Sequence, residues 1–543
     1  MSSEDQNPFS KLSPFQLDIL AECLEFESAG LEVPMGGGKT RISLVLANET
    51  TNSDKHILIV AQSKNLIGSW VDEIHEVFGD RYGIYVYHND YDKKYLQKRT
   101  VTTRFVITTP EMVRKFYVAN NLESWLVTKE TRNKGVFGEH EVILYSRNPQ
   151  PVDCSDIIFS THWGTLIIDE FHLVSKITTL QCRGLLCIPA NRKWLLSGTF
   201  FSDPDESHIL AYYTILNMYP HFPNSLPDTK KYIKGDLKEL PPFTGTRNTM
   251  VHRDKIPVVI RKVFHEIIVP LRPEEEKIYL ALRNIAIELN KEMQEEGADK
   301  KKFNSALLSM IPYLRQCITC AVLPVASMSL DVCSHGEIDT ISQRFFEIIG
   351  EMEIDEYLND VGSVISSKME RALQISSRHQ KVVIFTSYRT TIDLMMSVIE
   401  GIECFTLEGD MPGKERDAIL KKCKSLDRFI LFLTFKIGSS GMNLQFADTV
   451  IIMDTEWMEA NTSQAIARVA RQGQEQEVNI YFLLSNTGIE EAIFRKQINK
   501  SEIIDELQNG VVTTSRDKFK VQDIIILLEQ EQVSEKMRTL YVH

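Results

Sequence analysis

The sequence lacks the features that direct a chain into or through a membrane. Its first residues, MSSEDQNPFSKLSP, have no basic start followed by an apolar run, so we expect no signal peptide. No apolar stretch approaches the length needed to span a bilayer. Cysteine is scarce: nine scattered residues, an odd number, are typical of a reducing compartment and not of a disulfide framework. We therefore expect a protein that is not secreted and has no membrane partner.

The sequence also has fewer basic than acidic residues, 61 Lys and Arg against 74 Asp and Glu. The formal net charge of −13 argues against a surface that is basic all over, although a local basic groove remains compatible with it. The sequence has no internal repeat and no low-complexity tract. With 543 residues, 43% of them hydrophobic, the chain is too long for one core, and two or three domains are expected.

Two regions alternate short β-branched runs with segments of helical periodicity, which is the pattern of a parallel α/β sheet. Between them, residues 222–249 are polar and contain proline, as in a linker. Residues 273–323 have helical periodicity, and the weaker pattern of residues 118–160 indicates an insertion in the first region. The predicted strands are 56–61, 104–109, 164–169 and 193–198, then 381–387, 403–407, 428–434, 449–454 and 478–484.

The stretch LEVPMGGGKTRISL, residues 31–44, is predicted to be a phosphate-binding loop. The glycines Gly36, Gly37 and Gly38 leave backbone N–H groups free to converge on an anion, and a following helix points its positive end there. Lys39 would reach the β- and γ-phosphates of ATP, and the Thr40 hydroxyl would bind Mg²⁺. The strict pattern requires glycine at position 33, where this chain has Val33; a flexible turn beside a surface lysine is the alternative.

A second nucleotide motif is TLIIDEFH, residues 165–172. An apolar strand delivers two acids to its carboxyl end, where ligands bind in open α/β sheets. Asp169 would hold Mg²⁺, and Glu170 would orient or deprotonate the attacking water. Acid pairs also cap helices, but this pair follows a glycine-rich GKT and precedes His172.

Two further motifs would link this site to other parts of the protein. In LLSGT, residues 195–199, Ser197 and Thr199 close another strand and could couple the nucleotide site to a second ligand. In SQAIARVARQGQ, residues 463–474, Arg468 and Arg471 are three apart, so they are expected on one helix face. Arginines aimed at a nucleotide act as arginine fingers, worth roughly 10³–10⁵ in rate. A basic surface helix is the alternative, but small apolar residues surround both arginines.

The order and wording of these motifs resemble the SNF2 (Swi2/Snf2) group of superfamily 2 DNA-dependent ATPases, from about residue 10 to about residue 497. The chain departs from the pattern at Pro34, where an acid is common, at Phe200, where the group has proline, and at WMEA, where it has W-N-P. The matching segments are LSPFQ (12–16), AQSKNLIGSWVDEI (61–74), ITTPEMV (107–113), HWGTLIIDEFH (162–172), NRKWLLSGTFFSD (191–203) and GSSGMNLQFADTVIIMDTEWMEANTSQAIARVARQGQ (438–474).

The resemblance implies an α/β fold with two RecA-like parallel-sheet lobes in tandem and a helical insertion between them. It assigns residues 1–225 to lobe 1, 226–265 to a linker, 266–370 to the helical insertion, 371–500 to lobe 2 and 501–543 to a C-terminal helical tail. ATP with Mg²⁺ would be bound by lobe 1, with Gln16 reading adenine, and completed by Arg468 and Arg471. Coupling residues would be Ser197, Gly198, Thr199 and Gln464.

The resemblance also implies that double-stranded DNA is the partner and that strands are not separated. A motor should grip phosphates, because its contacts must not depend on base sequence. Trp457 could press on a base or ribose, with a core tryptophan as an equal alternative. Polar candidates at strand ends are Ser63, Thr108 and Thr109 in lobe 1, and Ser387, Thr434 and Asn443 in lobe 2.

One zinc candidate, Cys317, Cys320, Cys333 and His335, begins with a metal-like spacing but lies in an apolar segment, so we expect no structural zinc. The leading functional hypothesis is an ATP-driven translocase on duplex DNA that remodels protein–DNA complexes. The alternatives are a transcription-associated NTPase of viral type, which would serve RNA polymerase or other transcription and chromatin proteins, a strand-separating helicase, and a degenerate ATPase scaffold. The expected location is nuclear or, for a large DNA virus, a cytoplasmic virus factory or the virion.

Overall fold

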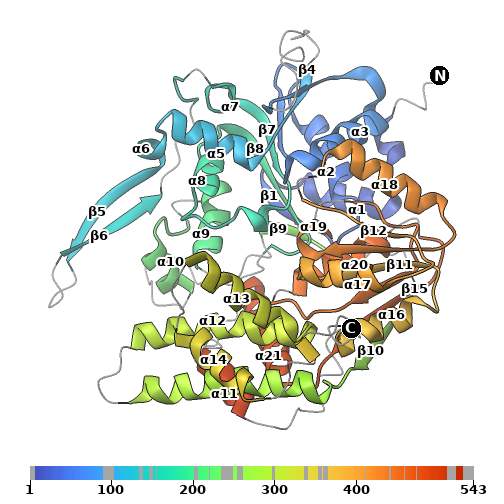
Figure 1. Ribbon diagram of the computed structural model, residues 1–543. Helices are drawn as coiled ribbons and strands as arrows, with labels where there is room; N and C mark the ends of the chain where they lie inside the picture. The colour runs from blue at the N-terminus through green and yellow to red at the C-terminus, as the bar shows by residue number, and fades with distance from the viewer. Residues whose placement is uncertain are drawn as a thin grey trace. The chain divides into compact units, whose positions relative to one another are not determined.

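The computed structural model divides the chain into two units, residues 1–259 with 500–516 and residues 260–499 with 517–543. Each unit is built on one parallel sheet (Figure 1). The described residues are 7–89, 103–133, 139–145, 151–154, 156–200, 206–218, 221–233, 249–253, 261–295, 300–335, 340–352, 357–358, 365–409, 411–438, 442–457, 459–471, 474–509 and 521–529.

The first sheet has seven strands in the order β3-β4-β2-β7-β8-β1-β9, and every neighbouring pair is parallel. The four predicted strands of this region are confirmed as β2, β4, β7 and β8. Three others were not predicted, because glycine, glutamate or histidine shortens or interrupts their apolar runs. The bounds are β1 Ala29–Glu32, β2 Ile57–Val60, β3 Gly83–Val86, β4 Thr103–Thr108, β7 Trp163–Ile168, β8 Ala190–Ser197 and β9 Met250–His252.

Both faces of this sheet are covered, because alternate residues of each strand enter two separate cores. Ile57 and Ile59 of β2 pack on one side, and Leu58 and Val60 pack on the other. The first face is covered by α1 Pro14–Cys23, α2 Lys39–Thr50 and α3 Ile67–Phe78. The second is covered by α5 Pro110–Ala119, α8 Leu180–Leu186 and α9 Glu206–Ile215. Buried on both faces, the strands read as continuous apolar runs.

The insertion expected at residues 118–160 forms an antiparallel hairpin that projects from the first unit (Figure 1). Arg132 on the hairpin binds Asp228 at 2.7 Å and so ties it to α10. The surrounding elements are α6 Glu123–Leu126, β5 Val127–Asn133, β6 Glu139–Tyr145, α7 Ile157–Ser160 and α10 Leu226–Ile233, with the 3-10 helices η2 Pro8–Lys11, η3 Lys64–Leu66, η4 Gly79–Arg81 and η6 Phe171–Leu173.

The second sheet has six parallel strands in the order β10-β15-β14-β11-β13-β12. All five predicted strands are confirmed, and β10 is added at the edge. The bounds are β10 Lys262–Ile268, β11 Lys381–Thr386, β12 Cys404–Thr406, β13 Phe429–Thr434, β14 Thr449–Ile452 and β15 Val478–Leu484. Its helices are α16 Ser367–Ser376, α17 Arg389–Val398, α18 Gly413–Ser425, α19 Phe435–Gly438 and α20 Glu459–Val469.

The stretch expected as a linker, residues 226–265, contributes structure to both units. It supplies α10 and β9 to the first, and the start of β10 to the second. The sequence pattern did not reveal β9 and β10, because histidine or glutamate interrupts their apolar runs. An edge strand such as KVFHEII is only half buried and therefore lacks the apolar run of a central strand.

Helices form a separate apolar core in the second unit, where α11 and α12 run side by side (Figure 1). The C-terminal helix α22 joins this core through Ile524, Ile525, Leu527 and Leu528. Within the described ranges, no helix is both long and apolar enough to cross a bilayer. The helices are α11 Pro273–Gln294, α12 Lys300–Thr319, α13 Val322–His335, α14 Thr340–Gly350, α21 Gly488–Asn509 and α22 Val521–Glu529.

A buried ion pair fixes α16 against α21 in this unit. Lys368 Nζ lies 3.2 Å from both carboxylate oxygens of Glu490, and the two side chains are 1% and 0% exposed. Glu490 also accepts hydrogen bonds from Thr455 Oγ1 at 2.6 Å and from Ser485 Oγ at 2.5 Å. With every donor supplied by a different segment, removing either charge would leave the other buried without compensation.

The close approach of α22 requires glycine at position 488. A Cβ atom there would lie 2.5 Å from the Leu527 carbonyl oxygen, a backbone atom that cannot rotate away. We predict that Gly488→Ala lowers the free energy of unfolding by about 1–3 kcal/mol through overpacking and exposes α22 to proteolysis. Urea unfolding and limited proteolysis measure both effects.

Gly68→Ala is the matched control, because nothing lies within 4 Å of a Cβ at Gly68 on α3. That change should leave stability the same or raise it by about 0.4–1 kcal/mol. Equal stability of the two variants would contradict the tight packing of α22 on residue 488.

Candidate functional site

The carboxyl ends of neighbouring strands bring the predicted nucleotide motifs together in the first unit. In the sheet, β2, β7, β8 and β1 are consecutive and parallel, so the residues that follow them meet at one edge. Asp169 follows β7, Ser197 ends β8, and the glycine loop follows β1. The sequence predicted this arrangement, because ligands bind where parallel strands end.

The glycine loop takes a conformation that only glycine adopts without strain. Gly36 and Gly38 have φ angles of 84° and 81°. Gly38 is the N-cap of α2, which begins at Lys39 as predicted, so the first N–H groups of the helix face the loop. A Cβ at Gly38 would lie 2.0 Å from Gln16 Nε2. The loop therefore has room for Gln16 only because position 38 is glycine.

Gln16 is fixed against this loop by bonds at both ends of its amide. Its Oε1 accepts the backbone N–H of Ser13 at 2.9 Å in a capping box that begins α1. Its Nε2 donates to the Gly37 carbonyl at 3.3 Å. The buried side chain is thus held at the glycine loop.

Lys39 is 8% exposed, and its Nζ donates to the Val33 carbonyl at 2.9 Å. Val33 stands where the strict pattern has glycine, and here its backbone carbonyl helps to hold the ammonium group. A Cβ at Gly198 would lie 3.6 Å from Lys39 Nζ, so the Ser197–Thr199 turn is adjacent. Three predicted elements, the loop, the lysine and the SGT turn, meet at this point.

Asp169 is anchored by a tryptophan from a different motif. The indole N–H of Trp70, on α3, donates to Asp169 Oδ2 at 3.1 Å. Burial, together with the neighbouring Glu170 charge, raises the pKa of Asp169 to about 7, while the Trp70 bond and Lys39 oppose the shift. Two adjacent carboxylates, one half-buried and one buried, favour binding of a cation, because a cation stabilises both charges.

Glu170 has a strained backbone and an oxygen that accepts no bond. Its φ and ψ are 44° and 52°, a left-handed conformation that costs a non-glycine residue about 1–3 kcal/mol. Within the described part of the chain, Glu170 Oε2 accepts no hydrogen bond, although His172 Nδ1 lies 3.4 Å away. Backbone strain and a buried oxygen left open are characteristic of functional positions.

His172 connects this acid to the SGT turn. Burial lowers the pKa of His172, which favours the neutral ring. Its Nδ1 lies 2.9 Å from Ser197 Oγ. Since the Ser197 hydroxyl donates to the Thr199 carbonyl at 2.7 Å, Nδ1 is the donor to Ser197. His172 therefore hydrogen-bonds to the predicted coupling turn at Ser197 and also lies beside Glu170, so the acid and the turn are neighbours.

The residues of this site fit Mg²⁺ with ATP. The half-buried Asp169 and the buried Glu170 attract a cation, and the glycine loop with Lys39 offers donors to an anion. Thr40, in the first turn of α2, supplies a hydroxyl of the kind that binds Mg²⁺ beside such a loop. No cluster of three metal-binding side chains occurs among the described residues, so a bound nucleotide would have to supply part of the coordination.

The second unit carries Gln464 and Arg468 on α20, where both are buried. The helix ends at Val469, so the expectation that Arg468 and Arg471 share one helix face is wrong for Arg471. The physical reason is Gln474. Its Nε2 donates to the Val469 carbonyl at 3.3 Å, in place of a backbone N–H from a further turn of the helix. Arg471 lies just beyond the helix and is partly exposed.

The other candidates of this unit lie around the ends of its strands. Ser387 Oγ donates to Glu456 Oε1 at 2.6 Å, and Asn443 is exposed. Trp457 packs against the helical core with Arg315 and Lys496 over its ring, at 5.5 and 4.4 Å from the centroid. The Trp457 ring thus packs on the core and also makes cation–π contacts with two basic side chains. Thr434 ends β13 and is partly buried.

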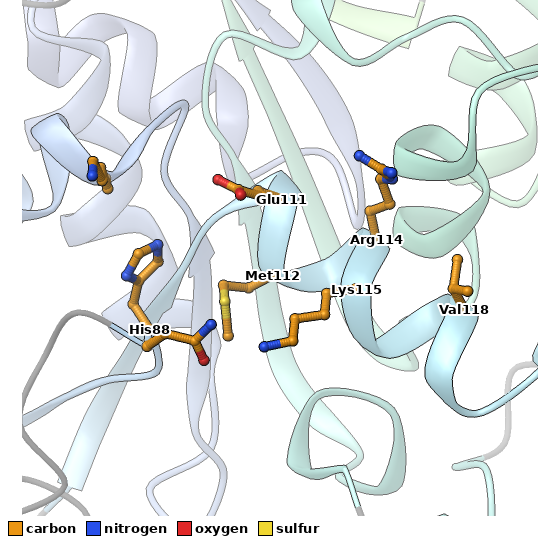
Figure 2. Close-up of a pocket in the computed structure, with 8 residues that line it drawn as sticks. His88, Glu111, Met112, Arg114, Lys115 and Val118 are labelled. Carbon is orange, nitrogen blue, oxygen red and sulfur yellow. The ribbon is translucent and has the colours of Figure 1, made fainter. Parts of the chain in front are cut away.

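The candidates of the first unit lie beside a basic hollow of about 560 Å³. Ser63 precedes its lining residue Lys64, whereas Thr108 and Thr109 are buried, and their hydroxyls accept or donate bonds within the chain. Figure 2 shows Lys115 extending from α5 toward Met112 and His88. The lining is Lys64, His88, Asn89, Glu111, Met112, Arg114, Lys115 and Val118, in which three lysine or arginine side chains oppose one carboxylate.

Cys317 and Cys320, the first pair of the zinc candidate, are buried in the apolar cores of the second unit. Burial raises the pKa of the Cys317 thiol well above its usual value, which favours the neutral, packed form. The side chains of Cys333 and His335 lie outside the described ones.

Sequence reasoning missed two features of this site. The bond from Trp70 to Asp169 joins motifs far apart in sequence, and spacing alone does not show it. The basic hollow depends on strands β2, β3 and β4 being neighbours, and β3 was not predicted. The available signal was the pair Arg114 and Lys115 directly after the ITTPEMV motif.

Comparison with protein families gives two matches. Residues 31–321, more than half of the chain, match the SNF2-related domain, and residues 367–473 match the helicase conserved C-terminal domain. Among solved structures, the Pyrococcus furiosus Hef helicase domain aligns at 15% identity with a TM-score of 0.48, covering 88% of this chain and 96% of that one. The Sulfolobus solfataricus SWI2/SNF2 ATPase core in complex with dsDNA aligns at 20% identity with a TM-score of 0.34, covering 92% and 93%.

Curated relatives are similar over most of this chain. The DNA repair and recombination protein RAD54B of Gallus gallus is 23% identical over 463 residues, covering 78% of this chain and 50% of the relative. A chromatin regulator of Danio rerio, SWI/SNF-related subfamily A containing DEAD/H box 1A, is 24% identical over 64% of this chain and 39% of its own. The chain spans about half or less of the length of these relatives.

The bond between Trp70 and Asp169 makes a specific prediction about metal binding. Trp70→Phe keeps the ring in the core but removes the N–H, so Asp169 loses a donor that opposes its raised pKa. We expect Mg²⁺ to bind about tenfold more weakly, since loss of a bond that orients a metal ligand typically costs 10–100-fold in affinity. Titration of Mg²⁺ in the presence of a non-hydrolysable ATP analogue measures it.

Trp194→Phe is the control, because Trp194 is equally buried in the same unit and its indole nitrogen donates no hydrogen bond within the described residues. It should leave Mg²⁺ affinity unchanged. If both variants bound Mg²⁺ as the unaltered protein does, Trp70 would have no part in orienting Asp169.

Proposed function

The chain belongs to the SNF2-related family, and on that premise we propose that it is an ATP-hydrolysing motor that translocates on double-stranded DNA and remodels protein–DNA complexes. One observation carries the proposal. A glycine loop with two positive φ angles, a buried lysine and two adjacent carboxylates converge at one sheet edge of the first unit. This set of donors and acids suits a nucleoside triphosphate with its metal ion.

Within this proposal each residue of the first unit has a defined task. Gln16 contacts the adenine side of the loop, Gly36–Gly38 present N–H groups to the phosphates, and Lys39 leaves the Val33 carbonyl to bind them. Thr40 and Asp169 hold Mg²⁺, which when bound with ATP neutralises phosphate charge. Glu170 accepts the proton of the attacking water or orients that water, using its open Oε2.

We propose that Arg468 and Arg471 of the second unit stabilise the charge that develops on the phosphates. Their positions on and just after α20, with Gln464 one turn earlier, support this role. Arg471 is the more exposed of the two arginines. It follows the end of α20, where the Gln474 side chain donates to the Val469 carbonyl. An arginine supplied in this way typically contributes about 10³–10⁵ to the rate.

Duplex DNA is the proposed track, and a DNA-containing compartment, nuclear in a cellular host, is the proposed location. Relatives named for DNA repair, recombination and chromatin regulation support both. In the first unit, the basic hollow beside Ser63 and Thr109 offers Lys64, Arg114 and Lys115 to phosphate groups. Basic side chains grip a backbone without reading sequence, as a translocating motor requires. At strand ends of the second unit, Ser387, Thr434, Asn443 and Trp457 are the proposed contacts.

The first test of this proposal is ATP hydrolysis with and without duplex DNA. We expect duplex DNA to stimulate hydrolysis, and we expect Lys39→Ala, Glu170→Gln and Arg471→Ala each to lower the rate by at least about 10³-fold. Displacement of the third strand from a triplex reports translocation, while a forked duplex should remain paired. Near-normal hydrolysis by Glu170→Gln would refute the catalytic assignment, and unwinding of the fork would favour a helicase instead.

The second test concerns the basic hollow. DNA affinity should fall steeply with salt, and Lys115→Ala should weaken binding to all sequences alike while reducing the salt slope by about one. Lys129→Ala is the control, because this lysine lies on the hairpin and binds Glu141 at 3.0 Å. A salt slope that Lys115→Ala and Lys129→Ala change equally would count against the hollow as a phosphate site.

A further inference from the structure

Glu32 is a buried carboxylate to which neither the motifs nor the proposed mechanism gives a role. It ends β1, directly before the glycine loop, and is 5% exposed. In the sheet it lies between Ser197 of β8 and His252 of β9, its register partners on either side. A buried carboxylate is costly unless each oxygen has a partner, so its contacts show what it does.

The two oxygens of Glu32 lie against different segments, and one of them accepts a hydrogen bond. Oε1 accepts the backbone N–H of Phe200 at 3.0 Å, and Oε2 lies 2.7 Å from His252 Nδ1. Phe200 directly follows the SGT turn, and its ring is fully buried against Phe171 and Tyr212. Glu32 thus ties the end of the SGT turn to the strand that leads into the glycine loop.

The bond to Phe200 exists only because position 200 is not proline. Proline has no backbone N–H, and its ring fixes φ. This chain has phenylalanine where the resembling motif has proline, so the backbone is not fixed covalently there. A charge-assisted bond from a buried carboxylate supplies a comparable restraint, since such bonds are short and directional. The departure at Phe200 and the acid at position 32 are therefore two parts of one contact.

The restraint acts on residues next to the proposed chemistry. The Ser197 carbonyl accepts the N–H of Val33 at 3.2 Å, and the Val33 carbonyl accepts Lys39 Nζ. On its other side, Ser197 Oγ binds His172, which lies 3.4 Å from Glu170. A displaced SGT turn would therefore shift the surroundings of both Lys39 and Glu170.

We propose that Glu32 is a positioning residue that, through the Phe200 N–H, holds the Ser197–Thr199 turn in the register needed for DNA to stimulate ATP hydrolysis. This inference rests on the proposed function. It assigns the stimulated rate, and not ATP binding, to the contact, because Gln16 and Lys39 are held by the Gly37 and Val33 carbonyls of the glycine loop itself.

A double-mutant cycle tests the contact and its consequence. The variants are Glu32→Ala, Phe200→Pro and the two combined, with Glu32→Gln as the conservative change and Glu22→Ala as control. Gln retains an oxygen for the Phe200 N–H, whereas Glu22 is a more exposed acid bound to Arg253 of the same unit. Each variant is assayed for the ratio of ATP hydrolysis with and without duplex DNA, for the KM of ATP, and for urea unfolding.

We expect Glu32→Ala to lower the stimulation ratio about tenfold while the KM for ATP changes less than about twofold, because misplacement and not binding is affected. Glu32→Gln should keep most of the stimulation, and Glu22→Ala should keep all of it. In the Phe200→Pro background, Glu32→Ala should have less than about a third of its effect on stimulation and on unfolding, since the bond is already absent.

The outcomes separate this inference from the proposed function. The inference alone is overturned if Glu32→Ala leaves the stimulation by DNA unchanged. It is also overturned if Glu32→Ala has the same effect with Phe200 as with Phe200→Pro. A KM that rises in step with the loss of rate does the same, because it indicates a role in ATP binding. No stimulation by DNA in the unaltered protein refutes the proposed function, and with it any positioning role, while the unfolding cycle still reports whether the contact exists.

Discussion

The local structure of the first unit depends on two adjacent carboxylates, Asp169 and Glu170, held beside Lys39 at one edge of a parallel sheet. Burial raises the pKa of Asp169, and the neighbouring charge adds to that shift. Such an arrangement is costly without a cation, and the surrounding residues limit the cost: Trp70 donates to Asp169, and Lys39 lies close enough to oppose the shift. The strained backbone of Glu170 indicates that the surrounding fold imposes this geometry.

Sheet topology explains how distant segments reach this edge. Because β2, β7, β8 and β1 are neighbours and parallel, an acid pair, a serine turn and a glycine loop emerge side by side. Hydrogen bonds then join them, from His172 to Ser197 and from Phe200 to Glu32. Because these bonds connect residues at one strand end to residues at the next, a shift at one motif would displace the others. The second unit repeats the parallel sheet and carries Gln464 and Arg468 on a helix that packs on it.

Much of this arrangement could be predicted from the sequence. Most strands read as apolar runs, and all nine predicted strands are present. The start of α2 at Lys39 followed from the glycines before it. Strands β1, β3, β9 and β10 were not predicted, because glycine, glutamate or histidine shortens or interrupts their apolar runs. The bonds of Trp70 and Glu32 could not be predicted either, because each joins residues far apart in sequence. The position of Arg471 beyond the end of α20, where the Gln474 side chain donates to the Val469 carbonyl, was also not predicted.

We propose above that ATP binds and is split at the carboxyl ends of β1, β7 and β8. A crystal structure with Mg²⁺, ADP and aluminium fluoride would test it most directly, because that mixture mimics the phosphate in transfer. We expect Lys39 Nζ to leave the Val33 carbonyl for the phosphates, Asp169 and Thr40 to contact the metal ion, and Glu170 to face the fluoride group. Nucleotide bound elsewhere, or Lys39 still bonded to Val33 beside a bound nucleotide, would contradict it.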